Sequence, residues 1–139
     1  MTEPVEYLDL DDLIDLAVLL LGDPAPIRDV GLLGSAVARP RTTVGGADAY
    51  PDLWTKAAAL LQSIVKNHAL VDGNKRLGWL ATAVFLELNG VRTTKVSDDD
   101  VYAFVMRVAA GKHEVDELAG QLERLIRSRP PRSAGTVGR

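Results

Sequence analysis

The apolar residues of the chain recur every three or four positions over most of its length, which is the spacing of amphipathic α-helices. Capping residues such as Asp9 or Asp11 and stop signals such as Gly22 mark where these stretches begin and end. The pattern predicts helices over about residues 9–21, 29–38, 51–67, 74–88, 97–111 and 115–128. It therefore predicts an all-α fold.

The stretch 74–88 differs from the other predicted helices because it is apolar on most of its sides. Its apolar positions are Leu77, Leu80, Ala81, Val84, Phe85 and Leu88. A helix of this kind is usually buried among other elements, so we expect it at the centre of the fold. Trp54 and Trp79 also stand at helical spacing and are interpreted as core residues.

Residues 40–50, PRTTVGGADAY, interrupt the helical pattern. The Gly45-Gly46 pair and the threonines beside Val44 are typical of a mobile loop or a short β-hairpin. Pro51 follows directly, and proline is favoured in the first turn of a helix. We therefore expect a short flap, as a loop or a hairpin, and then a helix whose first turn contains Pro51.

A single domain accounts for the chain as far as residue 128. The length of 139 residues is close to the usual size of a domain, and no repeat or linker divides the sequence. The last stretch, RPPRSAGTVGR, carries no pattern of packing residues. We therefore predict one domain over 1–128 and a disordered tail over 129–139.

The composition excludes several classes of protein. Hydrophobic residues make up 47% of the chain and charged residues 25%, which is ordinary for a globular protein. No apolar run approaches the ~18 residues of a membrane span, and the acidic start MTEPVEYLDLDD differs from a basic secretory signal. Without cysteine the chain forms neither disulfides nor thiolate metal sites. The net charge of −3 counts against a general nucleic-acid binder, so we expect a cytoplasmic protein without membrane contact or direct DNA binding.

The nonapeptide HALVDGNKR, residues 68–76, lies between the predicted helices 51–67 and 74–88. The start of the second helix exposes unpaired N–H groups and the positive end of the helix dipole. Gly73 permits a tight turn and the close approach of an anion. Lys75 and Arg76 are unfavourable in a first helical turn unless an anion binds there. This helix start is therefore predicted to bind phosphate.

His68 and Asp72 add two further chemical groups to this stretch. Asp72 offers a carboxylate that could hold Mg²⁺ against a phosphate. His68, with an unperturbed pKa of about 6.5, is mostly neutral at pH 7 and is the natural general base. A base, a metal-binding carboxylate and anion donors, all within residues 68–76, suit phosphoryl or nucleotidyl transfer.

Structural interpretations of the same residues stay open on composition and spacing alone. His68 can stabilise the end of the preceding helix, and Asp72 can cap the next one. Gly73-Asn74 can be an ordinary turn, and the two basic residues after it can be solvated. The spacing of a Walker A loop is missing, and no strand precedes the stretch.

Residues 68–76 resemble the core motif of the Fic/Doc family, HxFx(D/E)GN(G/K)R. The flanking stretches LLGSAVARP and YPDLWTKAAALLQSIVKN also resemble this family, and the likeness covers about residues 6–126. It implies a Fic-fold helical bundle. Leu70 stands where the family usually has Phe, an apolar change that the packing of the loop should tolerate.

Two positions make the chain resemble the Doc branch of the family, the death-on-curing toxins. AMP-transferring Fic proteins have Gly after the motif Asn and a second Arg three residues after the first, where this chain has Lys75 and Trp79. Doc toxins resemble them in fold but are kinases that phosphorylate a threonine of translation elongation factor Tu. The resemblance therefore implies the toxin of a toxin–antitoxin pair, which transfers the γ-phosphoryl group of ATP to a protein and blocks translation.

The resemblance also implies a role for each motif residue. His68 would take the proton from the acceptor hydroxyl, and Asp72 would bind Mg²⁺. The phosphates of ATP would be bound by Gly73, Asn74, Lys75 and Arg76. Residues 40–50 resemble the flap with which the family holds its target in extended form by strand addition.

Inhibition by a separate chain is a further implication of the resemblance. Many Fic proteins are silenced by an internal helix with the pattern (S/T)xxxE(G/N). No Glu of this sequence is followed by Gly or Asn. The inhibitor would then be a cognate antitoxin protein.

Three other functions compete with this interpretation. The first is AMP transfer to a protein hydroxyl by the same site. The second is a helical DNA-binding module, although the turn before residue 74 is longer than that of a helix-turn-helix and the next helix is apolar beyond Arg76. The third is an inactive, non-enzymatic helical family member that only binds a partner.

Overall fold

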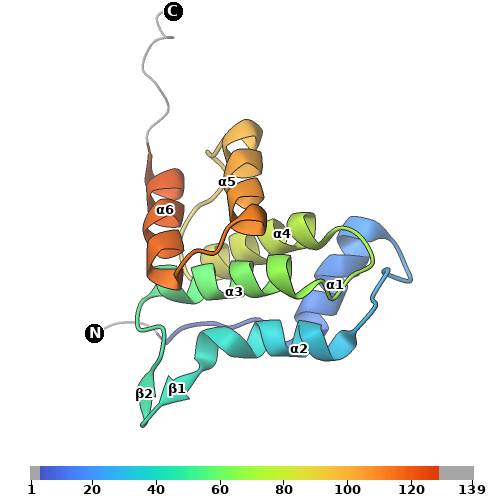
Figure 1. The fold of residues 1–139 in the computed structure, drawn as a ribbon, viewed down its shortest axis with the longest axis horizontal. Helices are drawn as coiled ribbons and strands as arrows, with labels where there is room; N and C mark the ends of the chain where they lie inside the picture. Colours follow the sequence, from blue (N-terminus) through green and yellow to red (C-terminus); the bar gives the residue numbers. More distant parts are fainter. Residues whose placement is uncertain (1–3, 129–139) are drawn as a thin grey trace, which may run out of the picture.

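The computed structural model describes residues 4–128, which form six α-helices and a short two-stranded hairpin (Figure 1). The helices are α1 (Leu10–Leu21), α2 (Val30–Ala38), α3 (Leu53–Asn67), α4 (Asn74–Leu88), α5 (Asp98–Ala110) and α6 (Val115–Arg127). A 3₁₀ turn, η1 (Arg39–Arg41), precedes the strands β1 (Thr43–Val44) and β2 (Ala47–Asp48). The predicted all-α fold with a short hairpin is confirmed. The predicted tail over 129–139 lies outside the described residues.

Polar side chains fix where the helices begin. Asp9 caps α1, because its carboxylate accepts a 2.8 Å hydrogen bond from the N–H of Asp12. Asp52 caps α3 with a 2.8 Å bond from the N–H of Thr55. Pro51 therefore precedes the cap, and the prediction that it lies in the first helical turn is wrong. The Asp52 carboxylate begins the helix instead because it satisfies an N–H group that has no partner within the helix.

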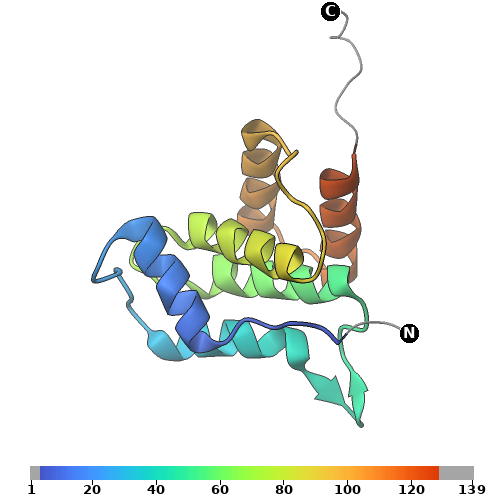
Figure 2. The same cartoon turned by 180° about the vertical axis from the view of Figure 1, so that it is seen from behind.

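Helix α3 lies at the centre of the fold and packs against α2, α4, α5 and α6. Figure 2 shows it between α2 on one side and the α5–α6 pair on the other. Its buried face includes the small residues Ala57 and Ala58 and the larger Leu61 and Ile64. None of the helices in the described part of the chain is long and apolar enough to cross a membrane.

Helix α4 packs closely along α3 but is less central than its sequence predicts. A Cβ at Gly78 would lie 2.7 Å from Cγ2 of Val65, so this glycine lets the two helices approach. Leu77 and Phe85 are buried, whereas Leu88 is 51% exposed. On its other sides Trp79, Leu80 and Ala83 line a cavity, and Val84 is only partly buried. Helix α4 is therefore apolar on most sides although other elements do not cover all of them.

The hairpin over 43–48 projects from the start of α3, and its residues are exposed. Its antiparallel strands pair Thr43 with Asp48. The base of the hairpin is held by Lys56 of α3, which is 1% exposed and whose Nζ lies 3.0 Å from Oδ2 of Asp48. The same ammonium group donates to the carbonyl of Tyr50. A buried lysine needs such partners, so the hairpin and α3 depend on each other.

Candidate active site at the start of helix α4

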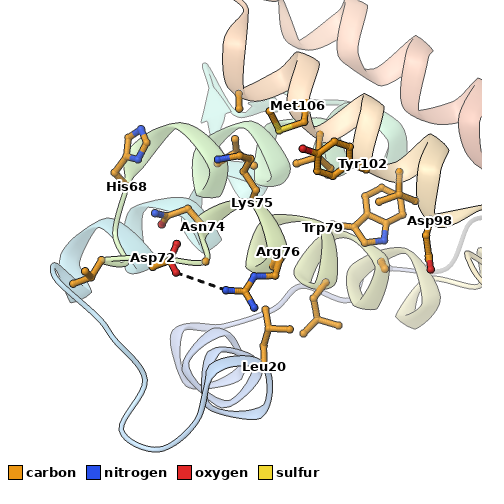
Figure 3. Close-up of a pocket in the computed structure, with 18 residues that line it drawn as sticks. Leu20, His68, Asp72, Asn74, Lys75, Arg76, Trp79, Asp98, Tyr102 and Met106 are labelled. Carbon is orange, nitrogen blue, oxygen red and sulfur yellow. Dashed lines mark ion pairs between the residues drawn. The ribbon is translucent and has the colours of Figure 1, made fainter.

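The residues of the HALVDGNKR motif, apart from the buried Ala69 and Leu70, lie along one edge of a cavity of about 880 Å³ (Figure 3). The motif forms the connection between α3 and α4 and the first turn of α4. The opposite wall is largely apolar and comes from later in the chain, with Val101, Tyr102, Val105 and Met106 of α5. The cavity therefore has a polar end at the motif and an apolar end between α4 and α5.

The start of α4 is open to an anion. Its N-cap is Gly73, which makes no side-chain capping bond, and the first helical hydrogen bond runs from the N–H of Leu77 to the carbonyl of Gly73 at 2.9 Å. The N–H groups of the three residues between them therefore have no partner within the helix. The exposed side chains of Lys75 and Arg76 line the same end of the cavity. These donors and the helix dipole make a site suited to phosphate.

Gly73 is required by the fold as well as by the site. Its backbone is left-handed, with a φ of 94°, which glycine adopts without a steric cost. A Cβ there would lie 2.9 Å from both Cδ atoms of Leu21, at the end of α1. Gly73, which is predicted to let an anion approach, thus also lets the loop turn and pack on α1.

His68 ends α3 and projects its ring from the loop. The residue is the C-cap of α3, with left-handed backbone angles of φ 56° and ψ 45°. Its side chain is exposed, and within residues 4–128 no hydrogen bond or ion pair holds its imidazole. Figure 3 shows His68 and Lys75 at the edge of the cavity, with Arg76 directed towards Asp72. The free ring is compatible with a general base that accepts a proton from an incoming hydroxyl.

The loop from His68 to Val71 is paired with the connection between α1 and α2. An antiparallel bridge joins Ile27 and Leu70, and the N–H of Val71 donates to the carbonyl of Pro26 at 2.8 Å. Figure 1 shows the two connections side by side. This segment carries no chemical motif that would mark it in the sequence.

The hairpin predicted at 40–50 forms, but it does not lie beside the motif. The hairpin ends at Asp48, shortly before α3 begins at Leu53, whereas His68 directly follows the last residue of α3. The 15 residues of α3 span ~22 Å. Both ribbon views place the hairpin and the motif at opposite ends of α3. The expectation that this hairpin holds a target next to His68 therefore receives no support from its position. Residues 22–29 are the segment that borders the motif.

Asn74 closes the loop from the side of α4. Its Oδ1 accepts a hydrogen bond from the N–H of Leu70, and its Nδ2 donates to the carbonyl of Leu70, each at 3.0 Å. Leu70 itself is 1% exposed, which anchors the loop in the core. The side chain of Asn74 thus shapes the loop, while its backbone N–H stays at the open start of α4.

Asp72 lies at the rim of the cavity. Its surroundings suit Mg²⁺ bound together with a phosphate better than a metal ion bound by protein side chains alone. Its side chain is 89% exposed, and its Oδ2 lies 3.9 Å from Nη2 of Arg76. In the described residues no three carboxylates or imidazoles gather into a metal-binding cluster. Mg²⁺ commonly keeps several waters and binds through one or two carboxylates together with substrate phosphates. A single exposed carboxylate beside an anion site suits that mode.

Two residues line the cavity although the sequence does not predict them there. Trp79 is half-buried and lines the cavity, although its helical spacing predicts a core position. Asp98 also lines it, from the first turn of α5, and no motif in the sequence marks this residue. The cap of α5 is Ser97, which accepts from the N–H of Asp100 at 3.1 Å. The apolar spacing of α4 and α5 could have indicated that the two helices face each other, but it does not mark Asp98.

Comparison with known proteins gives two matches. The model of the family described as the Fic/DOC family matches residues 7–86, a range that contains α1 to α3, the whole motif and most of α4. The curated protein named Toxin Doc, from Mycolicibacterium smegmatis, is 49% identical over 118 residues. That alignment covers 84% of this chain and 91% of the relative.

Proposed function

Because the chain belongs to the Fic/DOC family, we propose that it is a Doc-type toxin and an ATP-dependent protein kinase. It transfers the γ-phosphoryl group of ATP to a threonine of translation elongation factor Tu and thereby blocks translation. One observation carries the proposal: at the uncapped start of α4, Lys75 follows Asn74, and Trp79 stands where AMP-transferring relatives have a second Arg. The name of the relative Toxin Doc supports the toxin part of the proposal.

The phosphates of ATP bind at the start of α4. Gly73 and Asn74 supply backbone N–H groups, and Lys75 and Arg76 supply cations. A charge-assisted hydrogen bond to phosphate contributes about 1.5–3 kcal/mol. Lys75 occupies a place that is free for a phosphate in AMP-transferring relatives. The nucleotide is therefore reversed, so that its γ-phosphoryl group faces the acceptor.

His68 is the general base of the transfer. Its exposed ring has no competing partner among residues 4–128, so a target hydroxyl can reach it. As the threonine oxygen bonds to the γ-phosphorus, His68 takes the hydroxyl proton. The bond between the γ-phosphorus and the bridging oxygen then breaks and ADP leaves. General-base assistance of this kind typically accelerates a reaction by about 10²–10⁴-fold.

Asp72 would hold Mg²⁺ together with oxygens of the bound phosphates. When bound, the ion would neutralise phosphate charge during transfer. The ion pair of Asp72 with Arg76 is long and exposed, at 3.9 Å, so it competes weakly for the carboxylate. Arg76 in turn stays available to the nucleotide.

A cognate antitoxin chain is the proposed inhibitor. The sequence contains no Glu followed by Gly or Asn, so it lacks the inhibitory pattern of many Fic proteins. The antitoxin places a segment across the cavity beside residues 68–76. Expression of the chain alone should then slow bacterial growth, and co-expression of the antitoxin should restore it.

Mass spectrometry of purified elongation factor Tu after incubation with the chain, ATP and Mg²⁺ tests the reaction. We expect a gain of one phosphate on a threonine and no gain with the His68→Ala variant. Parallel reactions with ATP labelled at the α- or the γ-phosphate separate the two enzyme functions. Label from the γ-position alone supports the kinase, label from the α-position establishes AMP transfer, and transfer of neither label contradicts both.

A further inference from the structure

His68 has a backbone conformation that must be held in place. It is the one non-glycine residue with a positive φ in the described part of the chain, at 56°. A left-handed conformation is unfavourable for a non-glycine residue because its Cβ comes too close to the following carbonyl oxygen. The last carbonyl groups of a helix also have no partner within it, and His68 follows α3 directly. Contacts from elsewhere in the fold must therefore stabilise this residue.

Arg28 supplies these contacts from the connection between α1 and α2. Its guanidinium group, through Nη2, donates to the carbonyl oxygen of His68. Its backbone N–H donates to the carbonyl of Ala69 at 2.8 Å, and the N–H of Asp29 donates to the same carbonyl at 3.0 Å. Two consecutive carbonyl groups after α3 are thus satisfied by two consecutive residues that lie 40 positions earlier in the chain.

The support for Arg28 is itself rigid. Asp29 is the N-cap of α2 and accepts a 3.2 Å hydrogen bond from the N–H of Leu32. On the other side, the bridge between Ile27 and Leu70 joins the two connections. The position of Arg28 is therefore set by α2 and by the buried end of the loop, and the guanidinium group transmits it to His68.

The direction of the His68 ring depends on the backbone of His68, because the ring itself makes no hydrogen bond within residues 4–128. No residue among 4–128 hydrogen-bonds to the imidazole, so nothing but the backbone and the rotamer directs it. Resting on the proposed function, we infer that Arg28 is a positioning residue: it fixes the His68 backbone so that the ring meets the acceptor hydroxyl. Arg28 is not among the residues that line the cavity. Its loss therefore affects the rate of transfer more than the binding of ATP.

Steady-state kinetics of Arg28→Met test the inference. Methionine keeps an unbranched apolar stem and removes every donor of the guanidinium group. We expect kcat to fall about 10-fold or more, since small misplacements of a reacting group can cost up to about 100-fold. The KM for ATP should stay within about 2-fold of the wild-type value. Arg28→Lys, which retains a cationic donor, should recover most of kcat.

Gln62→Met is the matched control. Gln62 also donates from its side chain to a backbone carbonyl, that of His113 at 2.9 Å, but it lies outside the cavity and outside the predicted flap. This variant should keep kcat, and its melting temperature should fall at least as much as that of Arg28→Met. A wild-type kcat in folded Arg28→Met, or a change confined to KM, overturns the inference. So does a Gln62→Met variant that loses kcat to the same degree.

Measuring growth arrest on expression tests the role of Arg28 separately from the proposed function. If the wild-type chain labels elongation factor Tu from neither phosphate, the proposed function fails, whatever Arg28 does. Growth arrest on expression is then the readout, because it does not depend on the target or on the transferred group. Weaker arrest by Arg28→Met than by Gln62→Met, at equal protein levels, supports the inference, and equal arrest by the two variants overturns it.

Discussion

The side-chain amide of Asn74 binds both backbone polar groups of Leu70, accepting from its N–H and donating to its carbonyl, each at 3.0 Å. These bonds tie the loop that carries His68 to the first residue of α4. Asn74→Ala removes both and leaves two partly buried backbone groups without partners. We expect a loss of about 1–3 kcal/mol in the free energy of unfolding, measured by urea denaturation, together with a large loss of transfer activity.

Asn89→Ala is the control for this prediction. Asn89 makes the same kind of double contact far from the motif, accepting from the N–H of Glu6 and donating to its carbonyl, each at 2.9 Å. The two variants should lose similar stability, but Asn89→Ala should keep its activity at temperatures where it is folded. Equal activity in both variants would show that the Asn74 contacts serve stability alone.

The helices and their limits follow from local rules that a sequence displays directly. Asp9, Asp52 and Ser97 each cap the helix that begins one residue later. Gly73 is the N-cap of α4 and makes no side-chain capping bond, because glycine has no side chain. The placement of the motif at a helix start could therefore be predicted from neighbouring residues alone.

Contacts between distant residues could not be predicted in this way. Arg28 reaches His68 across 40 positions, and no periodicity marks it. The hairpin at 43–48 forms as expected, but its position depends on Lys56 and the direction of α3 rather than on its own residues. Tyr102 lines the cavity because α5 packs beside α4, which is a property of the whole bundle.

Replacement of His68 should separate chemistry from stability. The side chain is exposed and its ring has no partner within residues 4–128, so His68→Ala removes little packing. We expect a melting temperature within about 2 °C of the wild-type value, since a surface change usually costs under ~0.5 kcal/mol. Transfer to elongation factor Tu and growth arrest should both disappear.

His113→Ala is the control, and we expect it to affect stability and activity in the opposite way to His68→Ala. His113 is half-buried at the start of α6, and its Nδ1 lies 3.5 Å from Oε1 of Glu117. This variant should lose stability and retain transfer. A His68→Ala chain with full activity would contradict the assignment of the base, and a large fall in its melting temperature would indicate a structural histidine.

Protonation of Glu87 should lower the free energy of unfolding at acid pH. Its Oε2 accepts 2.8 Å and 2.9 Å hydrogen bonds from the N–H and the hydroxyl of Thr93. The backbone bond, followed by the hydroxyl bond, lowers the pKa of this carboxyl below its usual value. A carboxyl with a lowered pKa in the folded state stabilises the fold above its unfolded pKa, about 4.3. That contribution is lost as the pH falls through the folded pKa.

Urea denaturation of the wild type and Glu87→Gln between pH 3 and pH 7 measures this contribution, with the pH range chosen around the usual carboxyl value. The wild type should be the more stable protein near neutral pH, and the difference should shrink below about pH 4. Glu123→Gln is the control, because Glu123 pairs with Arg127 on the surface of α6 at 3.4 Å and makes no backbone contact of this kind. A difference between the wild type and Glu87→Gln that stays constant over the whole range would contradict the prediction.

Lys75 should decide which group of ATP is transferred. Lys75→Gly removes one cation from the start of α4, a loss of about 1.5–3 kcal/mol in phosphate binding. It also reopens the place where AMP-transferring relatives bind a phosphate. Phosphorylation of the target should fall by at least ~10-fold, and weak AMP transfer should be detectable with α-labelled ATP. The gain stays small because Trp79 still stands in the place of the second Arg.

Lys75→Ala separates the loss of charge from the creation of space. Alanine removes the same cation, favours the helix by ~1 kcal/mol over glycine, and leaves a Cβ in the reopened place. Both variants should lose phosphorylation, but AMP transfer should be stronger in Lys75→Gly. Adding Trp79→Arg to Lys75→Gly should raise AMP transfer further, because the second cation of the AMP-transferring relatives is then restored. Kinase activity that persists unchanged in Lys75→Gly would show that the orientation of the nucleotide is set by residues other than Lys75.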